Sequence, residues 1–235
     1  LVATTSDFGT RGDRPSHPQL LDWLAGELIR NDWQLKSVHR LIVTSSVYMQ
    51  GNDVLEKSAA LDPENLLLWR RVSRRLEAEA IRDALLAVSG KLDRRMYGKG
   101  SLDQKNGRRS VYLTMKRSQL ISILQLFDAP DAMSSIGKRE ESTVAPQALT
   151  MLNSPIIREW AVALAKQIRP DDKVEVAKSV EKAYRLVLGR APRAGELKHM
   201  TAFVNQRGDD AKLRAVGFYD FCHVLLCMNE FVYVD

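Results

Sequence analysis

Residues 108–155 read RRSVYLTMKRSQLISILQLFDAPDAMSSIGKREESTVAPQALTMLNSP and carry strand, helix and turn signals more densely than the rest of the chain. Apolar residues alternate over 110–115, which predicts a short half-buried strand. The spacing over 119–127 then changes to that of a helix with one apolar stripe. Pro130 predicts the end of that helix, because the residue before a proline is kept out of the helical region. After a polar loop, Pro146 suits the first turn of another helix. We therefore predict that a compact strand, helix, loop and helix unit lies at the centre of the fold.

Apolar stripes at helical spacing predict helices along most of the remaining chain. They run over residues 20–31, 33–45, 66–69, 74–90, 155–170, 176–189, 192–207 and 211–228. Ser16 and Gln19 fit a capping box before the first of these helices. Asp62 is a predicted cap, and Gly90 a predicted left-handed residue that closes its helix. The predicted fold class is all-α, mainly a helical bundle, with at most a short β element near residues 110–115.

Length and composition favour a single helical domain, residues 1–235. The hydrophobic content of 45% is enough for a core without disulfides. No run of about eighteen apolar residues is present to span a membrane. The start of the chain shows no leader peptide, but the abrupt opening Leu1-Val2-Ala3-Thr4 looks like the middle of a longer chain. The lack of a leader therefore carries no information about the compartment.

Positive charge is concentrated in residues 70–117, which hold fourteen Lys or Arg and five Asp or Glu, a balance of +9 in a chain whose net charge is +6. This asymmetry predicts a face that attracts a polyanion, such as an acidic polysaccharide or an acidic protein. The predicted polyanion-binding residues are Arg94, Arg95, Arg108 and Arg109. The alternative is that internal carboxylates use up several of these arginines. Few interleaved aromatic residues and no recognised motif argue against nucleic acid as the partner.

The cysteines and histidines give no sign of a metal or haem site. Cys222 and Cys227 are five residues apart in an apolar helical stretch and do not share a helix face, so we predict buried free thiols. The four histidines occur in no CxxC, HExxH or CxxCH pattern. We predict no metal and no cofactor in this chain.

A candidate catalytic group can be assembled from charged and aromatic residues of the central unit. The candidates are Arg109, Tyr112, Arg117, Asp128 and Asp131. Two carboxylates can act as acid and base only if they face one cleft and their environments separate their pKa values. In the alternative interpretation, Asp128 and Asp131 cap the turn around Pro130 and Arg109 pairs with them. We favour this structural interpretation.

Eight phrases, in order along nearly the whole chain, carry a resemblance to a known family. They are SDFGTRGDRPSHPQLLDWLA, LKSVHRLIVTSSVY, LDPENLLLWRRVSRRLEAEAIRDALLAVSGKLD, RRSVYL, LQLFDAPDA, STVAPQALTMLN, AYRLVLGRAPRAGE and MNEFVYVD. They resemble domain of unknown function 1553, also called planctomycete secreted domain one. The resemblance implies a C-terminal module of large bacterial proteins, which follows a signal peptide, often a cytochrome-c-like haem domain, and a second domain of unknown function. Members of this family begin earlier than Leu1, so an N-terminal helix is expected to be missing here.

Two functions follow as expectations. The resemblance implies an extracytoplasmic structural or interaction module with no established activity. Its partners would be the other domains of the same polypeptide, including the haem domains. Its basic face would dock an acidic protein or an acidic polysaccharide. The alternative is a polysaccharide-acting enzyme whose site lies around the five candidate residues.

Overall fold

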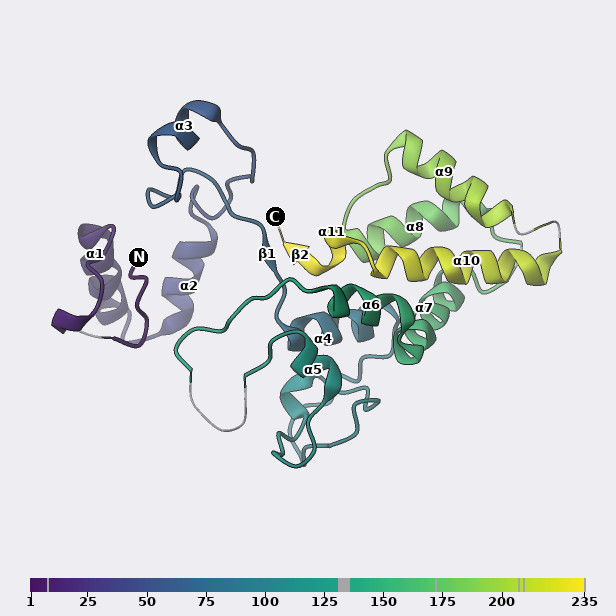
Figure 1. Ribbon diagram of the computed structural model, residues 1–235, viewed down its shortest axis with the longest axis horizontal. Coiled ribbons are helices and arrows are strands. Elements are labelled where there is room, and N and C mark those ends of the chain that lie inside the picture. Colours follow the sequence, from purple (N-terminus) through teal and green to yellow (C-terminus); the bar gives the residue numbers. More distant parts are fainter. Residues whose placement is uncertain (8, 131–135, 172, 207, 209, 235) are drawn as a thin grey trace. The chain divides into compact units, whose positions relative to one another are not determined.

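The structure is a computed structural model that describes the chain except residues 8, 131–135, 172, 207, 209 and 235 (Figure 1). The chain separates into two compact units. The first comprises Leu1–Arg74 with Ile136–Lys138, and the second comprises Arg75–Ser135 and Arg139–Val234. That residues 1–235 fold as a single domain stays a prediction.

The first unit consists of short helices, and no apolar side chain among its described residues is buried. Its elements are η1 (Gly9–Arg11), α1 (Pro18–Arg30), α2 (Leu35–Val43) and α3 (Glu56–Leu61). The α1 helix packs against α2 across a tight turn in which Asp32 and Trp33 both have positive φ. None of the residues in α1, α2 or α3 is buried.

The predicted capping box before α1 is wrong. The N-cap position is His17, and no side-chain hydrogen bond caps the helix. The Ser16 hydroxyl instead lies 3.0 Å from His17 Nδ1 and 3.3 Å from the carbonyl oxygen of Leu1. The Ser16 hydroxyl therefore contacts the first residue of the chain instead of capping α1.

Asp62 caps a turn and not the predicted helix over 66–69. Its carboxylate accepts hydrogen bonds from the backbone N–H groups of Leu66 and Leu67 at 2.9 and 2.8 Å. Asn65 and Leu68 both have positive φ, which a helix does not allow. Turns therefore replace the helix at this point.

The second unit holds most of the helices and the core. Its helices are α4 (Ala78–Val88), α5 (Ser122–Leu126), α6 (Ala145–Asn153), α7 (Pro155–Ile168), α8 (Val176–Leu188), α9 (Ala194–Asn205), α10 (Ala211–Leu226) and α11 (Asn229–Val232). The α10 helix packs against α7, α8 and α9 (Figure 1). Gly90, with φ of 70°, follows α4 in the left-handed conformation, as predicted.

The core is built where the apolar stripes of α7, α8 and α10 meet. Leu164 of α7, Val180 of α8 and Phe221 of α10 are fully buried. Phe221 also contacts Tyr184 of α8, with ring centroids 6.3 Å apart. Burying a large apolar side chain of this kind contributes roughly 1.5–3 kcal/mol, so these three helices carry much of the stability of the second unit.

The predicted strand at 110–115 is wrong. Residues Ser110–Tyr112 form a single 3-10 turn, η2, and Leu113 makes one isolated bridge to Ser101. The paired strands are instead β1 (Arg74–Arg75) and β2 (Tyr233–Val234). Because β1 takes up the start of the predicted 74–90 helix, α4 begins only at Ala78.

The mainly helical fold class is confirmed, since the structure is 52% helical and 4% strand. Within the described ranges, no helix is both long enough and apolar enough to cross a bilayer.

Candidate functional site

The segment 89–121 of the second unit, which we call the basic loop, is fixed by the buried side chain of Arg82. This α4 side chain is fully inaccessible to solvent. Its guanidinium donates hydrogen bonds to the carbonyls of Gln104 (3.1 Å), Asn106 and Arg108 (3.0 Å) and to the hydroxyl of Ser110 (3.2 Å). Burial lowers the pKa of Arg82, while the nearby carboxylates of Asp83 and Asp103 oppose the shift. One buried cation thus holds a long segment that has little regular structure of its own.

Arg108 is a second arginine whose side chain stabilises the basic loop from within. Its guanidinium lies 3.7 Å from the centroid of the Tyr112 ring. It donates hydrogen bonds to the carbonyls of Arg95, Tyr97 and Lys99. The Tyr112 hydroxyl in turn accepts a hydrogen bond from the Tyr97 backbone N–H at 2.7 Å. Both Nη groups of Arg108 therefore donate inside the loop, although we predicted that this arginine binds a polyanion.

The other three predicted polyanion-binding arginines differ in whether a carboxylate of the chain already pairs with them. Arg95 forms an ion pair with Asp93 at 2.6 Å, and this pair lowers the pKa of Asp93. Arg109 is 60% exposed and lies 3.9 Å from Asp83. Arg94 is exposed and has no charged partner in the described part of the chain. Arg94 and Arg109 are the two whose guanidinium groups remain available to an external anion.

Asp128 is held in place by Arg75, and not by Arg109 as the sequence had suggested. Arg75 Nη2 lies 2.6 Å from Asp128 Oδ2, and the guanidinium also sits over the ring of Phe127. Ser142 donates both its backbone N–H and its hydroxyl to the same carboxylate at 2.8 Å. Burial alone would raise the pKa of Asp128, but the hydrogen bonds from Ser142 and the charge of Arg75 outweigh it and hold the pKa below its ordinary value.

The candidate catalytic residues that the structure describes have different partners. Arg109 lies beside Asp83, Tyr112 beside Arg108, and Asp128 beside Arg75. No side-chain hydrogen bond or ion pair joins Arg109, Tyr112 and Asp128 to one another within the structure described. Arg117 is exposed. Asp131, the fifth candidate, lies outside the described residues.

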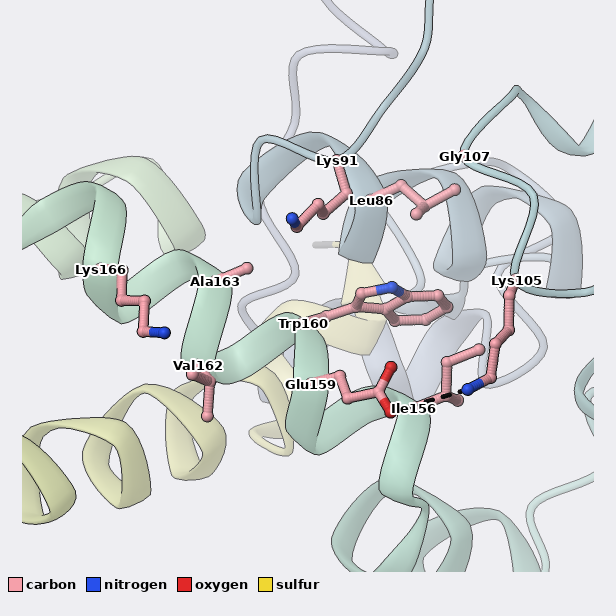
Figure 2. A pocket seen from close by; sticks show the side chains of 10 residues that line it. All are labelled: Leu86, Lys91, Lys105, Gly107, Ile156, Glu159, Trp160, Val162, Ala163 and Lys166. Carbon is pink, nitrogen blue, oxygen red and sulfur yellow. Dashed lines mark ion pairs between the residues drawn. The ribbon is translucent and has the colours of Figure 1, made fainter.

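A groove of about 480 Å³ opens between α7, the end of α4 and the basic loop (Figure 2). Lys91 and Lys105 of the basic loop and Lys166 of α7 line it, together with one carboxylate, Glu159. Lys105 Nζ lies 3.6 Å from Glu159 Oε1, and both side chains are more than half exposed. Three ammonium groups against one carboxylate give the groove a net positive charge.

Trp160 forms the aromatic wall of this groove. Figure 2 shows its indole between the side chains of Lys91 and Lys105, with the ring nitrogen on the edge toward Lys91 and Leu86. The residue is only 6% exposed, and its Nε1–H donates no hydrogen bond to any described residue. The apolar side chains of Leu86 and Ile156 also line the groove. The groove therefore offers positive charge, a free donor and apolar surface together.

Gly107 allows two stretches of the basic loop, the one around Lys91 and the one around Lys105, to approach each other at the groove. We call these stretches the two arms of the loop. A Cβ atom at this position would lie 2.6 Å from the carbonyl oxygen of Lys91. Close approach lets the Asp93 N–H donate to the carbonyl of Gly107 at 2.8 Å. This contact fixes Lys91 relative to Lys105, which are far apart along the chain but share the groove.

The groove was not predicted from the sequence, and none of the described candidate residues lines it. Lys91 and Lys105 were counted only as part of the basic stretch. A usable signal exists on α7, where Ile156, Trp160, Ala163 and Lys166 recur at three- and four-residue spacing. This second stripe differs from the core stripe of α7 and places an aromatic residue and a cation on one helix face.

Both cysteines are free thiols. Cys222 is buried and Cys227 partly buried. Burial raises the pKa of both groups, that of Cys227 to about 11. Among the residues that the structure describes, His, Cys, Asp and Glu side chains form no group of three that could hold a metal ion.

The second unit is mainly helical and carries a groove lined by three lysines and a tryptophan. The chain belongs to the family described as Protein of unknown function (DUF1553), whose sequence model matches residues 1–204. This confirms the resemblance. No curated protein and no solved structure matches the chain.

Proposed function

We propose that the second unit is a binding module for an acidic polysaccharide, and that the groove beside Trp160 takes one carboxylate-bearing sugar ring. The observation that carries the proposal is that Lys91, Lys105 and Lys166 line one groove together with Trp160, with only Glu159 to oppose their charge. The volume of about 480 Å³ lies within the range of small-ligand pockets, roughly 300–1,000 Å³.

The electrostatics of the groove suit exchange of one carboxylate for another. An exposed ion pair such as Lys105–Glu159 is worth only about 0–1 kcal/mol, because water screens both partners. A sugar carboxylate can therefore take the place of Glu159 beside Lys105 at little cost. Lys91 and Lys166 add positive charge elsewhere in the groove.

The aromatic and apolar surface supports a sugar rather than an acidic peptide. A sugar ring has an apolar face and polar edges, so it matches a wall that combines the Trp160 indole, its free N–H and aliphatic side chains. An inorganic anion would leave Leu86 and Ile156 without a partner. The carboxylates of an acidic protein would pair with the lysines but would not use the indole.

Exposed arginines of the basic loop give the second unit further positive charge that a polymer can contact. Arg94 and Arg109 have guanidinium groups that an external polyanion can reach. Contacts of this kind release counterions and weaken as salt rises. A polysaccharide anchored in the groove is thereby held by further, less specific contacts.

The enzymatic alternative has less support. An acid or base needs a carboxyl whose environment matches its pKa to the operating pH. The pKa of Asp128 is instead lowered, and its oxygens are taken up by Arg75 and Ser142. We therefore assign Asp128 a structural role and propose no reaction.

We place the module outside the cytoplasm, next to haem-bearing domains of the same polypeptide. The support is the family resemblance together with the state of the thiols. Thiols with a raised pKa hold little thiolate and react slowly, so Cys222 and Cys227 can remain unpaired in an oxidising compartment. We propose that the chain itself binds no cofactor.

Calorimetric titration with the trimer of β-linked glucuronate tests the proposal. The Lys91→Gln/Lys166→Gln double variant should bind at least about tenfold more weakly than wild type, since two of the three cations are gone. Lys182→Gln on α8, an exposed lysine that does not line the groove, is the matched control and should bind like wild type.

Three results would contradict the proposal. The first is wild-type protein that does not bind the trimer at millimolar concentration. The second is a double variant that binds as tightly as the control. The third is a trimer of glutamate that binds as well as the sugar, since this would favour an acidic protein as the partner.

A further inference from the structure

A second cavity, of about 310 Å³, adjoins the groove and carries no charged side chain. Ile156 and Trp160 line both cavities, so these two α7 side chains form a shared wall. The basic loop bounds both cavities as well, because the neighbouring residues Gln104 and Lys105 line the second cavity and the groove respectively. The two spaces therefore lie next to each other at the start of α7.

The second cavity presents hydroxyl groups that have no internal partner. They belong to Ser122 at the start of α5, Thr150 in α6 and Ser154 between α6 and α7. None of the three hydroxyls is hydrogen-bonded to a described residue, and Ser154 does not cap α7 with its side chain. Elsewhere in this unit, the hydroxyls of Ser89 and Ser110 are satisfied by backbone or carboxylate acceptors.

The polar and apolar groups that line the second cavity suit one class of ligand, a neutral sugar. Unpaired hydroxyls can both donate and accept, as can the amide of Gln104, which also lines the cavity. Ile123 and Leu126 add apolar surface. A neutral sugar matches these groups, because its hydroxyls need both donors and acceptors and its ring faces are apolar. A second sugar carboxylate would meet no cation here and would have to be desolvated without compensation.

We propose that the second cavity is a subsite for a neutral sugar, so that the two cavities together select a polysaccharide in which an acidic sugar is joined to a neutral one. The inference rests on the proposed function, since the acidic sugar occupies the groove. The wall formed by Ile156 and Trp160 then lies beneath the linkage between the two rings.

The test compares two disaccharides with the same linkage: cellobiouronate, which is glucuronate joined to glucose, and the glucuronate dimer. Wild-type protein should prefer cellobiouronate by about fivefold or more, because only the glucuronate dimer would have to desolvate a second carboxylate without a cation beside it. Thr150→Val keeps the shape of the side chain and removes the hydroxyl, so it should weaken the binding of cellobiouronate and reduce the preference. Thr114→Val, an exposed threonine outside the cavity, is the control.

Equal affinity of wild type for the two disaccharides overturns the neutral subsite but leaves the proposed function standing. A preference that survives Thr150→Val assigns it to another part of the surface and also overturns the inference. Binding of neither disaccharide overturns both proposals. If Thr150→Val does not fold, as judged by circular dichroism, Ser122→Ala takes its place with the same expectations.

Discussion

Arg75 and Asp128 form an ion pair of 2.6 Å that joins the end of β1 to the turn after α5. The arginine side chain is only 5% exposed, and Asp128 has a positive φ of 60°, which few non-glycine residues adopt. The ion pair therefore compensates the cost of burying the charge of Arg75 and the cost of the positive φ at Asp128.

Replacing Asp128 with Asn should lower the free energy of unfolding by about 1–3 kcal/mol, the usual effect of weakening a hydrogen-bonded charged partner. The Arg75 guanidinium would keep its buried position and lose its counter-charge. Urea denaturation of the variant measures the change, with Glu181→Gln, an exposed residue on α8, as control. An unchanged or raised stability would instead mark Asp128 as a residue retained for function.

Glu196 should make stability depend on acid pH. Its hydrogen bond from Arg190 lowers the pKa of Glu196 to about 2. The folded-state pKa is thus below the unfolded value, so the stabilisation is present above about pH 4.5 and is lost as the pH falls toward 2.

The variant Glu196→Gln should be less stable than wild type by about 1 kcal/mol at neutral pH, allowing for partial exposure of the pair. The difference should vanish near pH 2, where wild-type Glu196 is becoming protonated. Thermal unfolding of both proteins across the acid range measures this. A difference that stays constant with pH would show that the ion pair contributes nothing through its charge.

Gly107→Ala should damage the groove through the backbone. The added Cβ would lie 2.6 Å from the Lys91 carbonyl oxygen, so the two arms of the basic loop must separate. We expect a loss of about 1–3 kcal/mol of stability and weaker binding of the glucuronate trimer. The matched control is Gly195→Ala in α9, where nothing lies within 4 Å, and it should be neutral or stabilising by about 0.5–1 kcal/mol. Equal behaviour of the two variants would contradict the close approach at Gly107.

The exposed arginines should govern retention on heparin. The Arg94→Gln/Arg109→Gln variant should elute at lower salt than wild type, because two phosphate- or sulfate-type contacts are lost. Arg95→Gln should have a smaller effect, since Arg95 is already paired with Asp93. Arg108 is unsuitable for this experiment because its guanidinium holds the loop together. Unchanged elution of the double variant would show that these arginines do not contact the polymer.

The helices of the second unit could be predicted because their signals are local. The stripe Ile157, Ala161, Leu164 and Ile168 places one face of α7 in the core, and each of its members is buried. The left-handed conformation of Gly90 could be predicted for the same reason, since it depends only on where its own helix ends. The strand predicted at 110–115 failed because Asp83, from α4, accepts hydrogen bonds from both the N–H and the hydroxyl of Ser110.

The site could not be predicted because its parts come from distant segments. Lys91, Lys105 and Trp160 meet only after the basic loop has folded around Arg82. The partner of Asp128 was missed for a similar reason. Arg109 lies closer in sequence, but Arg75 reaches the carboxylate because β1 passes beside the turn after α5.

The most direct test of the groove is a pair of substitutions at one ion pair with opposite expected effects. Lys105 and Glu159 are both exposed, so replacing either should leave the fold intact. In calorimetric titrations with the glucuronate trimer, Glu159→Gln should tighten binding, because it removes the carboxylate that competes for Lys105, and Lys105→Gln should weaken it. Changes in the same direction, or no change in either variant, would contradict a groove that binds a sugar carboxylate.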